Sequence, residues 1–141
     1  MSELIPVSFL REAELKHGRI AMLGFLGFVV SEYVRLPGEI HNVSPVAAHD
    51  VFVQNGGMFQ ILAAVTALET VSIIALKDTI EGKRTPGDYG FDPLNLYRRL
   101  DQRNKDVMAY KEIKNGRLAM LGFAGAITQS ALFDSGFPYS S

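Results

Sequence analysis

Four polar side chains stand near the start of two long apolar segments, and their chemical types suit metal ligation. The stretch "ELKHGRIAMLGF" carries Glu14 and His17, and the stretch "EIKNGRLAMLGF" carries Glu112 and Asn115. Carboxylate, imidazole and amide side chains each offer a lone pair to a cation. The members of each pair are three residues apart and therefore share one face of a helix. The spacing predicts two similar ligating surfaces.

The two stretches are copies of one sequence. Residues 14–27 align with residues 112–125 at a constant offset of 98, and ten of the fourteen positions are identical. Apolar residues are shared by many helices, but a Glu, a Gly and an Arg repeated in register are not. The repeat favours two helices related by a pseudo-two-fold axis. The alternative is an old duplication in which the polar residues keep no role.

The arginines of the repeat need partners from outside their own helix. Arg19 follows Glu14 by five residues, which places it about 140° round the helix, and Arg117 follows Glu112 in the same way. A buried charge without a partner is costly. Pairing Glu14 with Arg117 and Glu112 with Arg19 satisfies all four charges. We therefore expect crossed helices joined by two reciprocal ion pairs.

Three helices are expected to position these side chains within a single domain of 141 residues. They cover residues 9–36, ended by "PG", residues 57–80, preceded by "NGG", and residues 109–134. None of them holds the roughly 18 uninterrupted apolar residues of a simple spanning helix. Hydropathy alone leaves buried soluble helices and polar-studded membrane helices open. Small residues at four-residue spacing, such as Gly122 and Ala126, are interpreted as helix packing.

The charges of the connections favour the membrane. Residues 77–111 hold eight Lys or Arg residues, whereas residues 35–58 hold only Arg35. This asymmetry is what the positive-inside rule predicts for three spans, with the N-terminus and the basic connection on one side. A net charge of −1 provides no basic surface for nucleic acid. The absence of cysteine excludes disulfides and thiolate metal sites.

The kind of metal follows from the difference between the two copies. "ELKH" fits the Glu-x-x-His motif of di-iron bundles, but the second copy reads "EIKN", and an arginine accompanies each carboxylate. Separate metals that each need one more ligand fit better, and the magnesium of chlorophyll is such a metal. Gln129 extends the donor column, because fourteen residues after Asn115 it returns to within about 40° of the same face. An internal hydrogen bond is the ordinary alternative for such a His or Gln.

Together with "GDYGFDPLNL", these motifs resemble the light-harvesting chlorophyll-binding proteins of plastid thylakoids. The resemblance implies an all-α membrane protein with three transmembrane helices, the first and third crossed. It implies bound chlorophyll a, a second chlorophyll (c or b, with c expected) and carotenoids of the xanthophyll class. No catalytic cleft is readable, so an enzyme is not expected.

The resemblance also implies a place and a task. The protein would transfer excitation energy to a photosystem core, with photosystem I favoured, among thylakoid lipids and neighbouring antenna proteins. Its N-terminus and residues 77–111 would lie on the stromal side. Photoprotective quenching is the alternative within the family, and a membrane di-iron redox protein is the alternative outside it.

Site residues are carried over by position in the motifs. The implied axial ligands of chlorophyll magnesium are Glu14, His17, Glu112, Asn115 and Gln129. In the middle helix, Glu69 is implied as a further ligand and Gln60 as a weaker one, with a hydrogen bond at a helix interface as the rival for both. The loop implied to hold one end of a carotenoid is "FDPL", residues Phe91, Asp92, Pro93 and Leu94.

Two departures from the green-plant proteins favour the red-lineage branch of the family. The connections are short and include "VSPVAAHDVFVQNGG", and the sequence stops at Ser141 before the amphipathic, His-bearing helix that green-plant members carry. The pigment of that helix is therefore not expected. His41 is expected to cap a turn, whereas His49 is left open between a cap and a pigment ligand.

Overall fold

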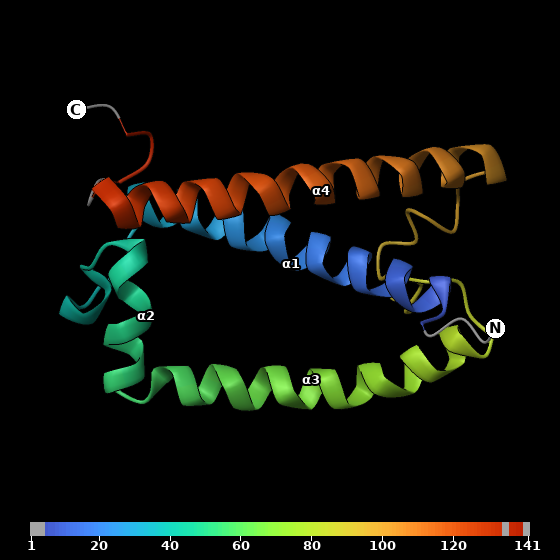
Figure 1. Ribbon diagram of the computed structural model, residues 1–141, viewed down its shortest axis with the longest axis horizontal. Helices are drawn as coiled ribbons and strands as arrows, with labels where there is room; N and C mark the ends of the chain where they lie inside the picture. Colours follow the sequence, from blue (N-terminus) through green and yellow to red (C-terminus); the bar gives the residue numbers. More distant parts are fainter. Residues whose placement is uncertain (1–4, 134–135, 140–141) are drawn as a thin grey trace.

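The computed structural model describes residues 5–133 and 136–139. Within them the chain forms α1 (Val7–Tyr33), the short 3-10 turn η1 (Glu39–His41), α2 (Pro45–Gln54), α3 (Gly57–Ile80) and α4 (Gln102–Phe133). Helices α1 and α4 run side by side, α3 runs apart from them, and α2 lies across one end (Figure 1). The expected all-helical class is confirmed.

The bounds of α3 agree with the expectation, whereas α1 begins at Val7 and ends at Tyr33 rather than covering residues 9–36, and α4 is longer than expected. It begins at Gln102 rather than at residue 109, and the expected last residue, Asp134, lies outside the described residues. Residues 102–106 are polar. An exposed helical turn needs no apolar stripe, so hydrophobic periodicity does not reveal it. The carbonyl of Asp101 accepts the N–H of Lys105 at 3.0 Å and starts the helix.

The connection between the first two expected helices contains a helix of its own, α2. The hydroxyl of Ser44 accepts the N–H of Ala47 at 3.3 Å, and Pro45 occupies the first helical position. The dipeptide "SP" is a typical start of a helix. The ten mostly apolar residues after Ser44 show no clear helical period, so the sequence pattern does not predict this helix. Gly56, with φ of +83°, then turns the chain into α3.

Helices α1 and α4 approach most closely at two glycines that are equivalent in the repeat, Gly18 and Gly116. A Cβ atom on either glycine would lie 3.0 Å from the Cα atom of the other. The pseudo-two-fold relation therefore has its centre at this crossing. Of the small residues interpreted as helix packing, Gly122 does face α1, whereas Ala126 is covered by Tyr139, whose hydroxyl donates to its carbonyl at 2.6 Å.

A second pair of contacts lies six residues further along each helix, nearly two turns away, again with two-fold symmetry. A Cβ on Gly24 would lie 3.5 Å from the ring of Phe123, and a Cβ on Gly122 would lie 3.8 Å from the ring of Phe25. Each phenylalanine thus fits over the glycine of the opposite helix. These contacts hold the two helices in one register, which is what fixes the relative positions of their polar residues.

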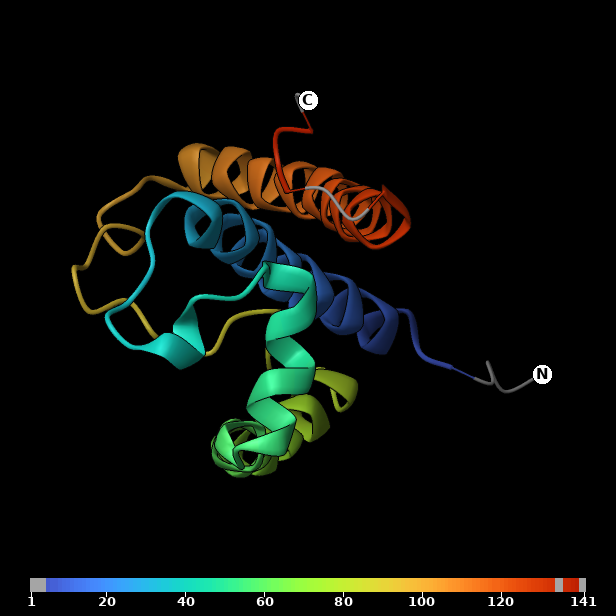
Figure 2. The same cartoon turned by 90° about the vertical axis from the view of Figure 1, so that its left-hand side faces the viewer.

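Helix α3 stands apart from the crossed pair (Figure 2). Most of its large apolar side chains are exposed. Thr79 is its one buried residue. Among the described helices, only α3 is long and apolar enough to cross a membrane by composition alone, with a mean hydropathy of 1.9 over its most apolar window. Helices α1 and α4 carry more charge, so their spanning a membrane rests on other arguments.

Candidate functional site

Both reciprocal ion pairs that the repeat predicts are present where α1 crosses α4. Arg19 Nε donates to Glu112 Oε1 at 2.6 Å, and Arg117 Nε donates to Glu14 Oε1 at 2.6 Å. The same atoms pair in both halves, because the residues are equivalent in the repeat and the glycine crossing lies between them. Each pair therefore joins the two helices and orients one carboxylate.

The two carboxylates differ in what they leave free. Glu112 Oε2 has no hydrogen-bond partner among residues 5–133 and 136–139. Glu14 Oε2, in contrast, accepts from Arg11 Nη1 at 2.5 Å. Glu112 therefore keeps one oxygen without a protein partner in the described part of the chain, and its role as a metal ligand stays a prediction. At Glu14 the second oxygen has a competing cation, which must move before a metal can take that oxygen.

His17 and Asn115 hold the same place in the two halves and make the same contact. His17 Nδ1 lies 2.7 Å from the carbonyl of Ala13, and Asn115 Nδ2 donates to the carbonyl of Lys111 at 2.8 Å. A carbonyl only accepts, so the histidine carries its proton on Nδ1. His17 Nε2 and Asn115 Oδ1 are thereby left as lone-pair donors on exposed side chains.

A shallow hollow adjoins the first of these donors. It has a volume of about 470 Å³ and is lined by Glu14, His17 and apolar residues of α1 and α4 that include Leu10 and Met120. Apart from the Arg11–Glu14 ion pair the wall is apolar, and with the lone pair of His17 it suits a flat, mostly apolar ligand whose metal needs a single further bond. The residues present therefore fit the chlorophyll that the sequence resemblance implies.

The remaining expected ligands lie on exposed faces of α3 and α4. Gln129 and Gln60 are both exposed, and neither side chain makes a hydrogen bond within the described residues. Glu69 Oε2 accepts from Lys16 Nζ at 2.7 Å and from Ser72 Oγ at 3.1 Å. The interface contact named as the rival for Glu69 is thus present, and it ties α3 to α1 while leaving Glu69 Oε1 for another partner.

The two histidines between α1 and α3 behave differently. His41 Nδ1 lies 3.1 Å from the carbonyl of Pro37, which is the turn cap expected for it. His49 Nδ1 lies 3.0 Å from Asp50 Oδ1 on the exposed side of α2. This contact leaves His49 Nε2 for a further bond, so a ligand role for His49 stays a prediction.

The "FDPL" loop is ordered by its aspartate. Asp92 Oδ1 accepts the N–H of Leu96 and Asp92 Oδ2 accepts the N–H of Arg98, both at 3.0 Å. These N–H groups, that of Arg98 most of all, hold the pKa of Asp92 below its ordinary value. Phe91 and Leu94 are exposed, with relative accessibilities of 86% and 69%. The loop therefore presents apolar side chains from a fixed backbone.

A larger groove connects this loop to the crossing. It encloses about 1150 Å³ between α1, the first half of α4 and the loop, and it is lined by Phe91, Asp92, Arg19 and Glu112 among others. Pro93 and Leu94 are not among its lining residues. Glu112 and two of the four expected loop residues, Phe91 and Asp92, thus line one groove.

Comparison with known protein families identifies the family to which this chain belongs. Residues 5–131 match the family described as chlorophyll A-B binding protein.

The chain belongs to the chlorophyll a-b binding protein family.

Curated relatives of this chlorophyll a-b binding family member come from two groups. It is 35% identical over 138 residues to light-harvesting complex stress-related protein 3.2 of Chlamydomonas reinhardtii, covering 84% of this chain and 51% of the relative. It is 34% identical to a fucoxanthin-chlorophyll a-c binding protein of Chattonella marina var. antiqua, covering 86% and 56%. It is 35% identical to one of Isochrysis galbana, covering 91% and 66%. The chain thus spans about half the length of the stress-related relative.

Three residues of this family member that sequence reasoning missed lie beside the groove. Glu12 of α1 is buried and contacts Arg84 and Tyr89 of the connection between α3 and α4. Desolvation of the Tyr89 hydroxyl, together with the carboxylate of Glu12, raises the pKa of Tyr89. Glu12 lies outside the repeat, so the strongest pattern in the sequence did not include it. Its local sequence, "REAELKH", is rich in charge and gives no signal that this glutamate is buried.

Proposed function

We propose that this protein is a light-harvesting antenna protein of the plastid thylakoid membrane. It binds chlorophyll a, chlorophyll c and xanthophyll carotenoids, and it transfers excitation energy to a photosystem core, for which the resemblance favours photosystem I. The observation that carries the proposal is the set of lone-pair donors on exposed faces of two crossed helices, Glu112 Oε2, His17 Nε2 and Asn115 Oδ1. The fucoxanthin-chlorophyll a-c relatives support the choice of pigments.

The proposed membrane arrangement has three spans, α1, α3 and α4. Their 27, 24 and 32 residues correspond to lengths of about 40, 36 and 48 Å, each more than the roughly 30 Å of a bilayer core. Eight basic residues in 77–111 favour the stromal side for that connection and for the N-terminus. Four charges of α1 and α4 are compensated because they pair across the crossing, Glu14 with Arg117 and Glu112 with Arg19.

The residues of this chain bind and orient pigments rather than react with them. Glu112, His17 and Asn115 would each hold one chlorophyll through its magnesium, and we extend the same role to Glu14, Gln129, Glu69, Gln60 and His49. The groove beside Phe91, Asp92, Pro93 and Leu94 is proposed to hold one end of a carotenoid. Bound chlorophyll supplies light absorption and excitation transfer, and rigid helices keep the pigments at constant distances.

Photoprotective quenching is the second candidate function, and one observation favours it. The stress-related proteins of Chlamydomonas reinhardtii are as similar to this chain, at 35% identity, as the antenna proteins are. The same ligands would serve both tasks, because quenching depends on the distance between pigments and not on the kind of axial bond. The partners of a quencher would include the same neighbouring antenna proteins.

Refolding the chain with chlorophyll a, chlorophyll c and carotenoids in detergent tests the proposal. We expect a complex with red chlorophyll bands, and excitation of chlorophyll c or carotenoid should produce chlorophyll a emission with a lifetime of nanoseconds. A strongly shortened lifetime in the isolated complex would support the quenching candidate. Bound iron with no chlorophyll would contradict both and would restore the di-iron alternative.

A further inference from the structure

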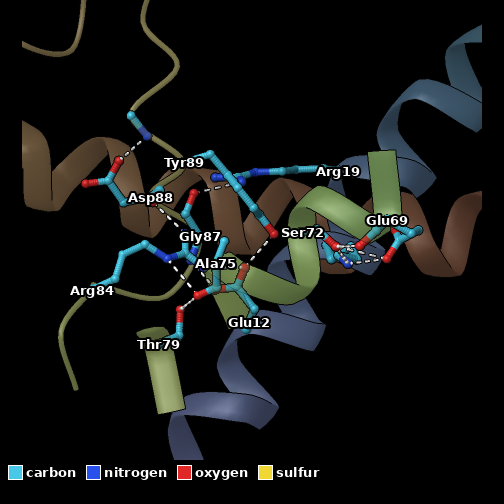
Figure 3. A network of polar contacts seen from close by, with 12 residues as sticks. Glu12, Arg19, Glu69, Ser72, Ala75, Thr79, Arg84, Gly87, Asp88 and Tyr89 are labelled. Atoms are coloured by element: carbon cyan, nitrogen blue, oxygen red, sulfur yellow. Dashed lines mark hydrogen bonds and ion pairs between the residues drawn. The ribbon is translucent and has the colours of Figure 1, made fainter. Parts of the chain in front are cut away.

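Glu12 is the only charged residue that is buried in the part of the chain the structure describes, with 3% of its surface exposed. Both of its oxygens are engaged by the segment that follows α3. Glu12 Oε1 accepts from the Tyr89 hydroxyl at 2.6 Å and from Arg84 Nη2 at 3.1 Å, and Glu12 Oε2 accepts from the N–H of Gly87 at 2.6 Å (Figure 3). A buried carboxylate with three donors is firmly held.

These bonds fix the position of Gly87 against α1. Gly87 has a φ of +81°, and a Cβ on it would lie 2.5 Å from Leu15 Cδ1. Arg84 adds to the anchoring, because its Nε donates to the carbonyl of Ala75 at 3.1 Å and its Nη1 to the carbonyl of Asp88 at 2.5 Å. The backbone around Gly87 is therefore held from both sides in one conformation.

The segment in turn holds Arg19. The carbonyl of Gly87 accepts from Arg19 Nη1 at 2.8 Å, and the ring of Tyr89 lies 5.9 Å from the guanidinium carbon of Arg19. Arg19 Nε is the group that binds Glu112 Oε1. A continuous series of contacts thus runs from Glu12 through Gly87 and Tyr89 to Arg19 and ends at the carboxylate of Glu112.

The other half of the repeat lacks this support. The position equivalent to Glu12 is Tyr110, and Arg117 has Glu14 as its one hydrogen-bonding partner among the described residues. The side chain of Arg117 is 60% exposed, compared with 36% for Arg19. Glu14 and Glu112 are equivalent in the repeat, but the arginine that orients Glu112 is itself held by more contacts than the arginine that orients Glu14.

Building on the proposed function, we infer that Glu12 is a positioning residue for the pigment bound by Glu112. Through Gly87, Tyr89 and Arg19 it orients Glu112 so that Oε1 stays on the arginine and Oε2 faces the groove. The ligand class is a chlorophyll whose magnesium takes one carboxylate oxygen. Removing such an outer partner typically lowers the affinity for a metal by about 10- to 100-fold.

The test compares Glu12→Gln with a reference that lacks the ligand, both refolded as full chains with chlorophyll a, chlorophyll c and carotenoid. The reference is Glu112→Val, which removes the ligand while Arg19 keeps its bond to the carbonyl of Gly87. Its absorption difference from the unaltered chain identifies the band of one chlorophyll. We expect Glu12→Gln to lose the same band, with an affinity for that chlorophyll lowered by about 10- to 100-fold, while the band that depends on His17 stays.

Two further variants separate positioning from general stability. Glu81→Gln is the matched control, because Glu81 pairs with Lys83 at 2.5 Å next to Arg84 without contacting Glu12, and it should keep every band. Tyr89→Phe removes one donor to Glu12 and keeps the ring, so it should weaken the same band even if Glu12→Gln fails to refold.

The outcomes distinguish this inference from the proposed function. If Glu12→Gln and Tyr89→Phe keep the band, or lose all bands in equal proportion, the positioning role is wrong and Glu12 only anchors the loop. If Glu112→Val loses no chlorophyll, Glu112 is not a ligand, and the site assignment itself fails.

Discussion

His17 and Asn115 occupy equivalent positions on two helices and offer different atoms to the same kind of partner. Each donates a hydrogen to the carbonyl four residues earlier, that of Ala13 or Lys111. This bond orients the side chain and decides which atom is left as an acceptor. A site built this way depends on one lone pair and on its direction, and depends little on whether the lone pair belongs to nitrogen or oxygen.

Replacing His17 by leucine should remove one chlorophyll per protein, because leucine offers no lone pair in the hollow beside Glu14. His17→Asn should keep that chlorophyll, since asparagine makes the required bond at position 115. Pigment stoichiometry of the two refolded variants checks the prediction. A leucine variant with unchanged stoichiometry would remove His17 from the site.

At the scale of the elements, the crossing of α1 and α4 depends on backbone contact. Gly18 and Gly116 have no room for a Cβ, whereas a Cβ on Gly125 would meet nothing within 4 Å among the described residues. Some glycines of these helices are thus needed for close contact between the backbones and others are not, and the sequence does not distinguish the two kinds. The contact also sets the distance over which the arginines reach the opposite carboxylates.

Gly116→Val should therefore push the helices apart and destabilise the complex by about 1–3 kcal/mol, the usual cost of overpacking. Gly125→Val is the matched control, with the same change in helix propensity on the same helix. Thermal loss of pigment from the two refolded proteins measures the difference. Equal stability of the two variants would place the crossing elsewhere.

The "FDPL" loop should respond to pH through Asp92. The pKa of Asp92 lies below its ordinary value of 3.8 because the ionised carboxylate accepts N–H groups of Arg98 and Leu96. Its contribution to loop stability is therefore fully present above pH 3.8 and is lost as the pH falls through the lowered pKa. Hydrogen exchange should show protected amides at positions 96 and 98 at neutral pH and loss of protection in acid.

Asp92→Asn provides the control for this pH dependence. It should reduce the protection of both amides already at neutral pH and remove the change in acid. Protection that falls with pH in the variant as it does in the unaltered chain would assign the effect to another group.

At the scale of the whole molecule, a symmetric sequence folds into an asymmetric structure. The repeat makes Arg19 and Arg117 equivalent, yet Arg19 also contacts the carbonyl of Gly87 and the ring of Tyr89. The connection between α3 and α4 provides these contacts on one side. One half of the crossed pair is therefore covered by the loop, and the other half is open.

Arg19→Leu should impair assembly with pigments more than Arg117→Leu does, and more than the loss of any single ligand such as His17. The leucine at position 19 leaves Glu112 unpaired and also releases the loop at Gly87, whereas Arg117 holds only Glu14. The yield of pigmented protein after refolding checks the order of these effects. A normal yield for Arg19→Leu would contradict a structural role for its ion pair.

The sequence by itself determined the elements that repeat and the charges that must pair. The identities at an offset of 98 predicted two related helices and the partners of Glu14 and Glu112, because an unpaired charge in such a helix is too costly to keep. Three of the helices were predictable from apolar runs and their Gly and Pro boundaries. Helix α2 and the first turns of α4 were missed, since neither shows an apolar period.

Only the tertiary structure decided which small residues touch, which oxygens are free and which residues support the site. Gly18 and Gly27 are both glycines of the same helix, and only the packed structure shows that Gly18 contacts α4. In the same way, only the structure shows that Arg11 binds the second oxygen of Glu14. Glu12 joins the site across 75 residues of sequence through Gly87. Contacts at such a separation depend on how the loop folds back onto α1, and no local pattern of residues records that path.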